Sequence, residues 1–113
     1  MKLFDGKLNE AAKLFYDNAK AHGFYDQEPT FMERMALVHA EISEAVEEYR
    51  KDGQVCSVWY SGTGKPEGVP IELADAIIRI LDFAGRNGID LEKAIEEKHA
   101  YNVSRPYKHG KIA

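Results

Sequence analysis

The sequence predicts an all-α protein, a four-helix bundle with one long loop between its second and third helices. Three observations lead to this fold class. Apolar residues recur at helical spacing in four segments, capping and stop residues bound those segments, and the alternating pattern typical of strands is nearly absent. With 113 residues, of which 44% are hydrophobic, the chain can form one small core, so residues 1–113 are expected to be a single domain.

The first two predicted helices have clear start or stop residues. The first covers about residues 9–22 and ends at Gly23, a residue suited to the left-handed conformation just past a helix. The second begins after Thr30, which forms a capping-box pattern with Glu33, and continues to about residue 51. The apolar face of the second helix, expected to face the core, comprises Met35, Val38, Ile42, Ala45, Val46 and Tyr49.

The third and fourth helices follow the long loop. The third covers residues 70–88, because Pro70 suits the first turn of a helix and Gly88 its end. Asp90 then caps the fourth helix, which continues to about residue 103. The apolar face of the third helix comprises Leu73, Ala74, Ile77 and Leu81, with Ile71 and Ile78 to one side.

The loop between the second and third helices, residues 53–69, is longer than ordinary connections and is therefore expected to be functional. Residues 55–60 carry its strand signal and predict a small hairpin. Trp59 and Tyr60 are candidates for a stacking surface or a lid, although Trp59 can equally pack the loop onto the bundle. Residues 62–65 are not a phosphate-binding P-loop, because the glycine spacing is wrong and no strand precedes them.

Charge and cysteine content narrow the class of protein. The net charge of −4 argues against a protein that coats nucleic acid, and no apolar run has the length of a membrane span or a signal-peptide core. The single cysteine, Cys56, excludes an intrachain disulfide and a cysteine-based zinc site and fits a reducing compartment, so a cytoplasmic protein is expected. An acidic body precedes a basic end, residues 98–113, which includes the tail at 104–113; a site for a metal-bound polyanion needs this arrangement, and a merely solvated tail is the alternative.

Two pairs of carboxylates are the candidates for chemistry. Glu41 with Glu44, and Glu72 with Asp75, are each three residues apart on a helix, so their side chains are neighbours. If the two helices pack antiparallel with these pairs facing, the repulsion among four carboxylates must be offset by protons or cations. An all-oxygen ligand set favours Mg²⁺ or Mn²⁺ over zinc or copper. The alternative is that these acids belong to the solvent-exposed stripe of an amphipathic helix, which would comprise Glu72, Asp75, Arg79 and Asp82.

Hydrogen-bond donors gather at the end of the fourth helix. Lys98, Asn102 and Arg105 are spaced four and three residues apart, and Lys108 follows in the tail. Such donors suit phosphate oxygens, which arginine can bind with two hydrogen bonds. A lysine near a helix C-terminus also complements the helix dipole, so a structural role for Lys98 stays open.

These residues resemble the MazG-like, all-α nucleoside triphosphate pyrophosphohydrolases. Residues 40–45 (Ala-Glu-Ile-Ser-Glu-Ala) and 72–75 (Glu-Leu-Ala-Asp) are similar to the Glu-x-x-Glu and Glu-x-x-Asp metal motifs of that family. Residues 101–111 are similar to the tail of its short, stand-alone members, and with residues 22–26 the resemblance covers most of the chain. Many members carry a glutamate where this chain has Ala40.

The resemblance implies hydrolysis of a nucleoside triphosphate between its α and β phosphorus atoms, which gives a nucleoside monophosphate and pyrophosphate and would cleanse the nucleotide pool. The implied cofactor is Mg²⁺, with Mn²⁺ as a substitute, and its ligands and the catalytic residues would be Glu41, Glu44, Glu72 and Asp75. The implied phosphate-binding residues are Lys98, Asn102, Arg105 and Lys108. The base would need an aromatic slot, for which the candidates are Phe24, Tyr25, Trp59 and Tyr60.

In some members of that family the glutamate at the position of Ala40 is assigned to orienting or deprotonating water, so the resemblance leaves the general base of this chain open; Glu44 or a metal-bound hydroxide could serve. The resemblance also implies a homo-oligomer, a dimer or a dimer of dimers. The small size of the core agrees, because four helices in so short a chain leave apolar surface for a partner to cover.

Two other classes of protein compete with this interpretation. A di-iron carboxylate bundle needs Glu-x-x-His on two helices, and the chain supplies it once, at Glu96 and His99. A non-catalytic helical protein that senses nucleotides or binds partners would carry the same acids as solvated faces.

Overall fold

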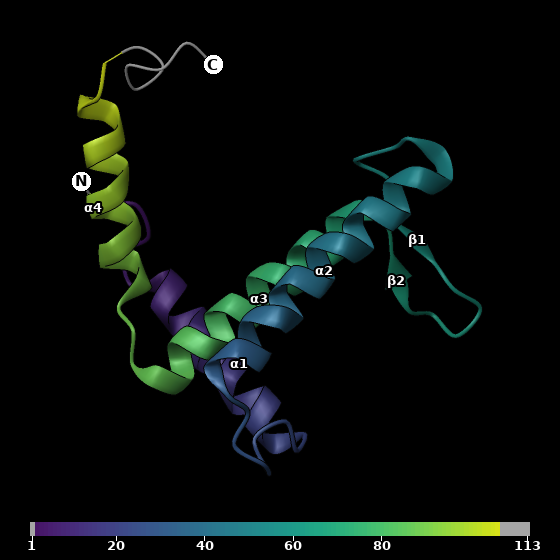
Figure 1. Ribbon diagram of the computed structural model, residues 1–113, viewed down its shortest axis with the longest axis horizontal. Coiled ribbons are helices and arrows are strands. Elements are labelled where there is room, and N and C mark those ends of the chain that lie inside the picture. The colour runs from purple at the N-terminus through teal and green to yellow at the C-terminus, as the bar shows by residue number, and fades with distance from the viewer. Residues whose placement is uncertain (1, 107–113) are drawn as a thin grey trace.

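The computed structural model describes residues 2–106, which form four helices and one short hairpin (Figure 1). The prediction of an all-α protein is confirmed, and the predicted helix boundaries agree to within a few residues. None of the described helices combines the length and the apolar character needed to cross a bilayer. In chain order the elements are α1 (Lys7–Ala21), α2 (Phe31–Asp52), β1 (Trp59–Tyr60), β2 (Pro66–Glu67), α3 (Val69–Asn87) and α4 (Leu91–Ser104).

Local signals set the helix ends, as the sequence predicts. The Thr30 hydroxyl accepts a hydrogen bond from the backbone N–H of Glu33 at 3.1 Å and so caps α2. The Asp90 carboxylate accepts one from the N–H of Lys93 at 3.1 Å and caps α4. Gly88 ends α3 with a φ of 65°, a left-handed conformation that costs glycine no side-chain clash.

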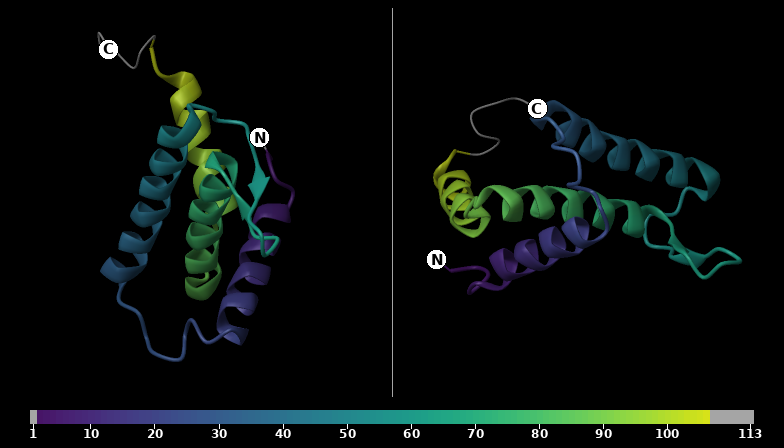
Figure 2. Two further views of the ribbon diagram at one scale, coloured as in Figure 1. Left: turned by 90° about the vertical axis from the view of Figure 1, so that its right-hand side faces the viewer. Right: turned by 90° about the horizontal axis from the view of Figure 1, so that it is seen from below.

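Helix α3 lies between α1 and α2 and packs against both (Figure 2). Small residues allow the close approach to α1, because a Cβ on Gly85 would lie 2.4 Å from the backbone oxygen of Ala12. On the other side, Ala45 of α2 and Ala76 of α3 are both buried. The three helices form a thin core whose buried apolar residues are small or medium in size.

Helix α4 does not pack along the other three helices within one chain. It leaves the end of α3 and extends away from it (Figure 1), and it contacts α1. The contact is polar. The buried Glu92 carboxylate accepts hydrogen bonds from the N–H groups of Gly6, at 2.9 Å, and Asn9, at 2.8 Å, and so caps the first turn of α1 from a distant segment.

The predicted inward faces of α2 and α3 are buried only in part in the single chain, where Ala45 and Leu81 are buried. Asp82, placed by the sequence on the polar stripe of α3, is only 6% exposed, so this stripe turns toward α2. Other residues of the predicted apolar faces are left uncovered, because charged side chains occupy part of the α2–α3 contact. We call the uncovered residues, which follow one another at helical spacing, the exposed apolar stripes; they comprise Ile42, Val46 and Tyr49 on α2 and Leu73, Ile77 and Ile80 on α3.

The loop between α2 and α3 forms the predicted hairpin. Trp59 pairs with Glu67 and Tyr60 with Pro66, so the second strand lies beyond the segment that the sequence marks as strand-like. The hairpin returns to α3 through Gly68, whose φ is 120°. A Cβ there would lie 2.3 Å from the backbone oxygen of Ser57, so only glycine fits.

Candidate metal centre

Three carboxylates from two helices meet between α2 and α3. Glu41 of α2 and Glu72 and Asp75 of α3 each offer an oxygen, and these three oxygens lie within 4.8 Å of one another. Glu72 and Asp75 are neighbours because they are one turn apart on the same helix. Glu41 reaches them because α2 and α3 run antiparallel, with Arg34 against Asp82 at one level and Glu41 against Arg79 at another. We call Glu41, Glu72 and Asp75 the acid cluster.

The fourth predicted ligand, Glu44, is not a member of the acid cluster. It is exposed on the next turn of α2. Its charge is nevertheless close enough to contribute to the raised pKa of Glu72. The structure therefore brings three of the four predicted carboxylates together and leaves the fourth beside them.

The electrostatics of the acid cluster are those of acids held close together. Burial raises the pKa of Glu72 to about 7, and the hydrogen bond with Glu41 and the charges of Asp75, Glu41 and Glu44 add to this effect. Burial and the charge of Glu41 also raise the pKa of Asp75, while Arg79 opposes this increase. At neutral pH the acid cluster thus retains part of a proton, which a cation can replace.

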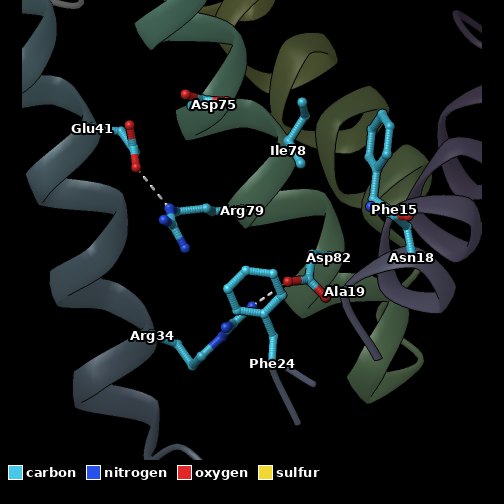
Figure 3. A pocket seen from close by; sticks show the side chains of 10 residues that line it. All are labelled: Phe15, Asn18, Ala19, Phe24, Arg34, Glu41, Asp75, Ile78, Arg79 and Asp82. Carbon is cyan, nitrogen blue, oxygen red and sulfur yellow. Dashed lines mark hydrogen bonds and ion pairs between the residues drawn. The ribbon is translucent and has the colours of Figure 1, made fainter. Parts of the chain in front are cut away.

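Arg79 is the nearest cation to the acid cluster. Its Nε donates a hydrogen bond to Glu41 Oε1 at 2.9 Å (Figure 3). The sequence places Arg79 on the same helical stripe as Asp75, one turn further on, but gives no indication of its partner. The Glu41 side chain is 13% exposed and that of Arg79 is 30% exposed, so this ion pair sits at the edge of the core.

An open cleft of about 390 Å³ runs from the acid cluster between α1, α2 and α3. Figure 3 shows Glu41, Asp75 and Arg79 toward one end and Phe24 with Arg34 toward the other. The volume lies within the range of small-ligand pockets. The remaining lining residues, Phe15, Asn18, Ala19, Ile78 and Asp82, make the wall between these ends partly apolar.

A buried ion pair forms the floor of this cleft. Arg34 and Asp82 are 5% and 6% exposed and bond directly to each other, and Asp82 also accepts a hydrogen bond from the Tyr25 hydroxyl at 2.7 Å. The guanidinium groups of Arg34 and Arg86 each lie 4.9 Å from the centre of the Tyr25 ring. Burial, and then the hydrogen bond to Asp82, raise the pKa of Tyr25 well above its usual range. Tyr25 thus ties the segment between α1 and α2 to α3, and it does not line the cleft.

The candidate aromatic residues for a base slot separate in space. Phe24 is 60% exposed and lines the cleft. Trp59 and Tyr60 lie in the hairpin, and Trp59 lines a different cavity of about 350 Å³ beside Lys51, whose ammonium nitrogen is 5.4 Å from the ring centre. Among the four candidates, Phe24 is therefore the one that shares a cleft with the acid cluster.

The predicted phosphate-binding residues of α4 lie apart from the acid cluster of the same chain. Lys98 and Arg105 flank the ring of Tyr101, at 4.8 Å and 5.4 Å from its centre. From Asp75 to the end of α3 at Asn87 is 12 residues, or about 18 Å of helix, and α4 then turns away. Asn102 is exposed on the same part of α4, and Lys108 lies outside the described residues.

Comparisons of this chain with protein-family models, curated proteins and solved structures give no match. The chemistry of the site is therefore judged from its own residues. Three carboxylates with no nitrogen or sulfur ligand fit a hard divalent cation such as Mg²⁺ or Mn²⁺, which binds through a few carboxylates together with water or phosphate oxygens. The sequence did not single out Arg34 or Phe15; the available signal was the pair of opposite charges, Arg34 and Asp82, on the two acid-bearing helices.

Proposed function

We propose that this protein is a Mg²⁺-dependent nucleoside triphosphate pyrophosphohydrolase that gives a nucleoside monophosphate and pyrophosphate and serves to cleanse the nucleotide pool. The observation that carries the proposal is the meeting of Glu41, Glu72 and Asp75 beside an open, partly apolar cleft. A nucleotide needs both features, because its phosphates are recognised through cations and its base through an apolar wall.

The acid cluster would hold the metal. Glu41, Glu72 and Asp75 supply the oxygen ligands, and Mn²⁺ would substitute for Mg²⁺. A bound cation would neutralise phosphate charge and lower the pKa of bound water. Glu44, exposed beside the acid cluster, would orient a water molecule, with a metal-bound hydroxide as the alternative base.

The other end of the cleft would receive the nucleoside. Phe24 offers an exposed ring, and Phe15 and Ile78 extend the apolar wall. Asn18 adds an amide that can both donate and accept hydrogen bonds. A nucleoside triphosphate bound along the cleft would thus place its phosphates toward Glu41 and Asp75 and its base toward Phe24.

The protein is proposed to act as a homo-oligomer, a dimer or a dimer of dimers. Among the described residues no large side chain is less than 2% exposed, so one chain by itself has a weak core. The exposed apolar stripes on α2 and α3 are surfaces that a second copy can cover. Because α4 stands apart in its own chain, its donors Lys98, Asn102 and Arg105 would reach phosphates bound by another copy.

The proposed location is the cytoplasm, where nucleotide pools are found. Cys56 is free and exposed, which fits a reducing compartment.

The alternative is a non-catalytic nucleotide-sensing or interaction protein. It is favoured by the ion pair between Glu41 and Arg79, because an acid that already has a partner does not need a metal for its stability. Hydrolysis separates the two proposals, since a sensor binds the nucleotide without releasing pyrophosphate.

The test is a screen of ribonucleoside, deoxyribonucleoside and damaged nucleoside triphosphates with Mg²⁺, read out as pyrophosphate. We expect pyrophosphate from at least one substrate and a loss of at least a hundredfold for Glu41→Gln or Asp75→Asn, as for removal of a metal ligand. Glu47→Gln is the matched control, because Glu47 is exposed and, within residues 2–106, forms its ion pair with Arg50, at 3.8 Å. Orthophosphate as the sole product would contradict α,β cleavage.

A further inference from the structure

One carboxylate of the acid cluster is already bound to a cation of the chain itself. Arg79 Nε lies 2.9 Å from Glu41 Oε1, and the Glu41 side chain is only 13% exposed. A charge-assisted hydrogen bond of this length at the edge of the core is strong compared with an exposed ion pair. Any cation that takes Glu41 as a ligand must therefore compete with Arg79 for the same carboxylate.

Arg79 differs from Arg34, the second arginine that lines the cleft. Arg34 is 5% exposed and is held by Asp82, which is itself buried. Arg79 is 30% exposed, and the hydrogen bond that it forms within residues 2–106, to Glu41, uses Nε alone. Its two terminal amino groups extend into the cleft (Figure 3). Of the two arginines that line the cleft, Arg79 is thus the one that can change partner without disrupting the buried ion pair between Arg34 and Asp82.

The position of Arg79 also suits an anion bound at the acid cluster. It lies one helical turn from Asp75, so the two side chains project from neighbouring positions of α3. A polyphosphate that shares a cation with Glu41 and Asp75 would lie beside the guanidinium, which can form two parallel hydrogen bonds to phosphate oxygens.

We propose that Arg79 is a phosphate-binding residue that exchanges partners: it pairs with Glu41 when the acid cluster is free of metal, and it binds a phosphate oxygen of the nucleotide when a divalent cation takes Glu41. This inference rests on the proposed function and adds a residue that the acid motifs do not contain. It makes Arg79 a competitor of the metal and a partner of the triphosphate.

The two roles of Arg79 predict opposite changes in affinity for the divalent cation and for the triphosphate when Arg79 is replaced. Arg79→Gln removes the competitor, so divalent cations should bind more tightly without nucleotide. The same variant removes a charge-assisted hydrogen bond to the nucleotide, so the triphosphate should bind more weakly. A purely structural arginine would give the same sign for both ligands, because its loss would disturb the whole site.

The experiment measures Mn²⁺ binding by electron paramagnetic resonance without nucleotide, and then binding of an α,β-methylene nucleoside triphosphate, at saturating Mg²⁺, by calorimetry. The analogue carries the base of the best substrate found in the screen. We expect Arg79→Gln to bind Mn²⁺ more tightly by severalfold and the analogue more weakly by about tenfold or more, the scale of one charge-assisted hydrogen bond. Arg79→Lys keeps the positive charge but lacks the planar guanidinium group. Its affinity for the analogue should therefore lie between the affinities of the unaltered protein and of Arg79→Gln.

Arg50→Gln is the control for net charge, because Arg50 is 71% exposed on α2 and pairs with Glu47. It should change neither affinity. Weaker Mn²⁺ binding by Arg79→Gln, or unchanged binding of the analogue by that variant, would overturn the inference. If circular dichroism shows that Arg79→Gln is poorly folded, the test passes to Arg79→Lys, whose unchanged binding of the analogue would overturn the inference. If the unaltered protein binds neither Mn²⁺ nor the analogue, the proposed function fails as well, so the two failures are distinguishable.

Discussion

Glu72 links the stability of the metal-free protein to pH. Burial is the main cause that raises its pKa, from an ordinary value of 4.5 to about 7. Because the pKa is higher in the folded state, the folded protein binds more protons than the unfolded chain between these two values. The resulting stabilisation is fully present below pH 4.5 and is lost as the pH rises through 7.

The magnitude follows from the size of the pKa increase. An increase from 4.5 to about 7 corresponds to about 3 kcal/mol for a fully shielded group, and solvent screening of the half-buried Glu72 lowers this to about 1 to 2 kcal/mol. We therefore expect the contribution of this group to lower the free energy of unfolding by about 1 to 2 kcal/mol between pH 5 and pH 8. Mg²⁺ should offset the loss at pH 8, because a cation then takes the place of the proton.

The assay is urea unfolding in the presence of a chelator, at one fixed protein concentration because the protein is proposed to associate. Glu72→Gln mimics the protonated acid and should remove this part of the pH dependence, whereas the exposed control Glu47→Gln should retain it. The same pH dependence in Glu72→Gln and in the unaltered protein would refute the reasoning.

Three further predictions concern the framework around the site. Glu92→Gln weakens the cap on the first turn of α1, so the free energy of unfolding should fall by about 1 kcal/mol, measured by urea unfolding, with no change in Mn²⁺ affinity; a large change in metal affinity would contradict a purely structural cap. Asp82→Asn leaves the buried Arg34 without its anion, so thermal unfolding should show that the free energy of unfolding falls by about 3 kcal/mol. A free energy of unfolding within error of the unaltered protein would count against a stabilising role of the buried pair. Ile77→Glu places a charge in an exposed apolar stripe, so light scattering should show a smaller assembly, and an unchanged mass would show that this stripe is not an interface.

In the metal-free protein the acid cluster reduces its own repulsion in two ways. Glu72 retains a proton over much of the neutral pH range, and Arg79 neutralises Glu41. Under the proposed function, a single divalent cation would replace both the proton and the Arg79 partner. Metal binding is therefore expected to release protons and to strengthen as the pH rises from 6 to 8.

Much of the fold follows from short-range signals in the sequence. Thr30 and Asp90 cap their helices as predicted, and the glycine at position 88 ends α3 in the expected left-handed conformation. The neighbouring positions of Glu72 and Asp75 also follow from helical spacing alone. These features depend on residues within one turn of each other, so a single sequence contains all the information they need.

Features that join distant segments were decided by the tertiary structure. The sequence favoured Leu73 and Ile77 as core residues, but in one chain they are exposed and Asp82 is buried, because Arg34 pairs with Asp82 across the α2–α3 contact. Helical spacing shows which residues share a face of a helix. It does not show which of two faces turns toward the neighbouring helix when another surface could cover the remaining face.

By itself, the sequence determined the helices, their caps and the two acid pairs, because backbone hydrogen bonding and helical periodicity act over a few residues. The tertiary structure alone decided that Glu41 meets Glu72 and Asp75, that Arg79 pairs with Glu41, and that α4 stands apart with Glu92 capping α1. The physical reason is that these contacts depend on the burial and charge of surfaces far apart in the chain, whose balance is settled only when the helices pack.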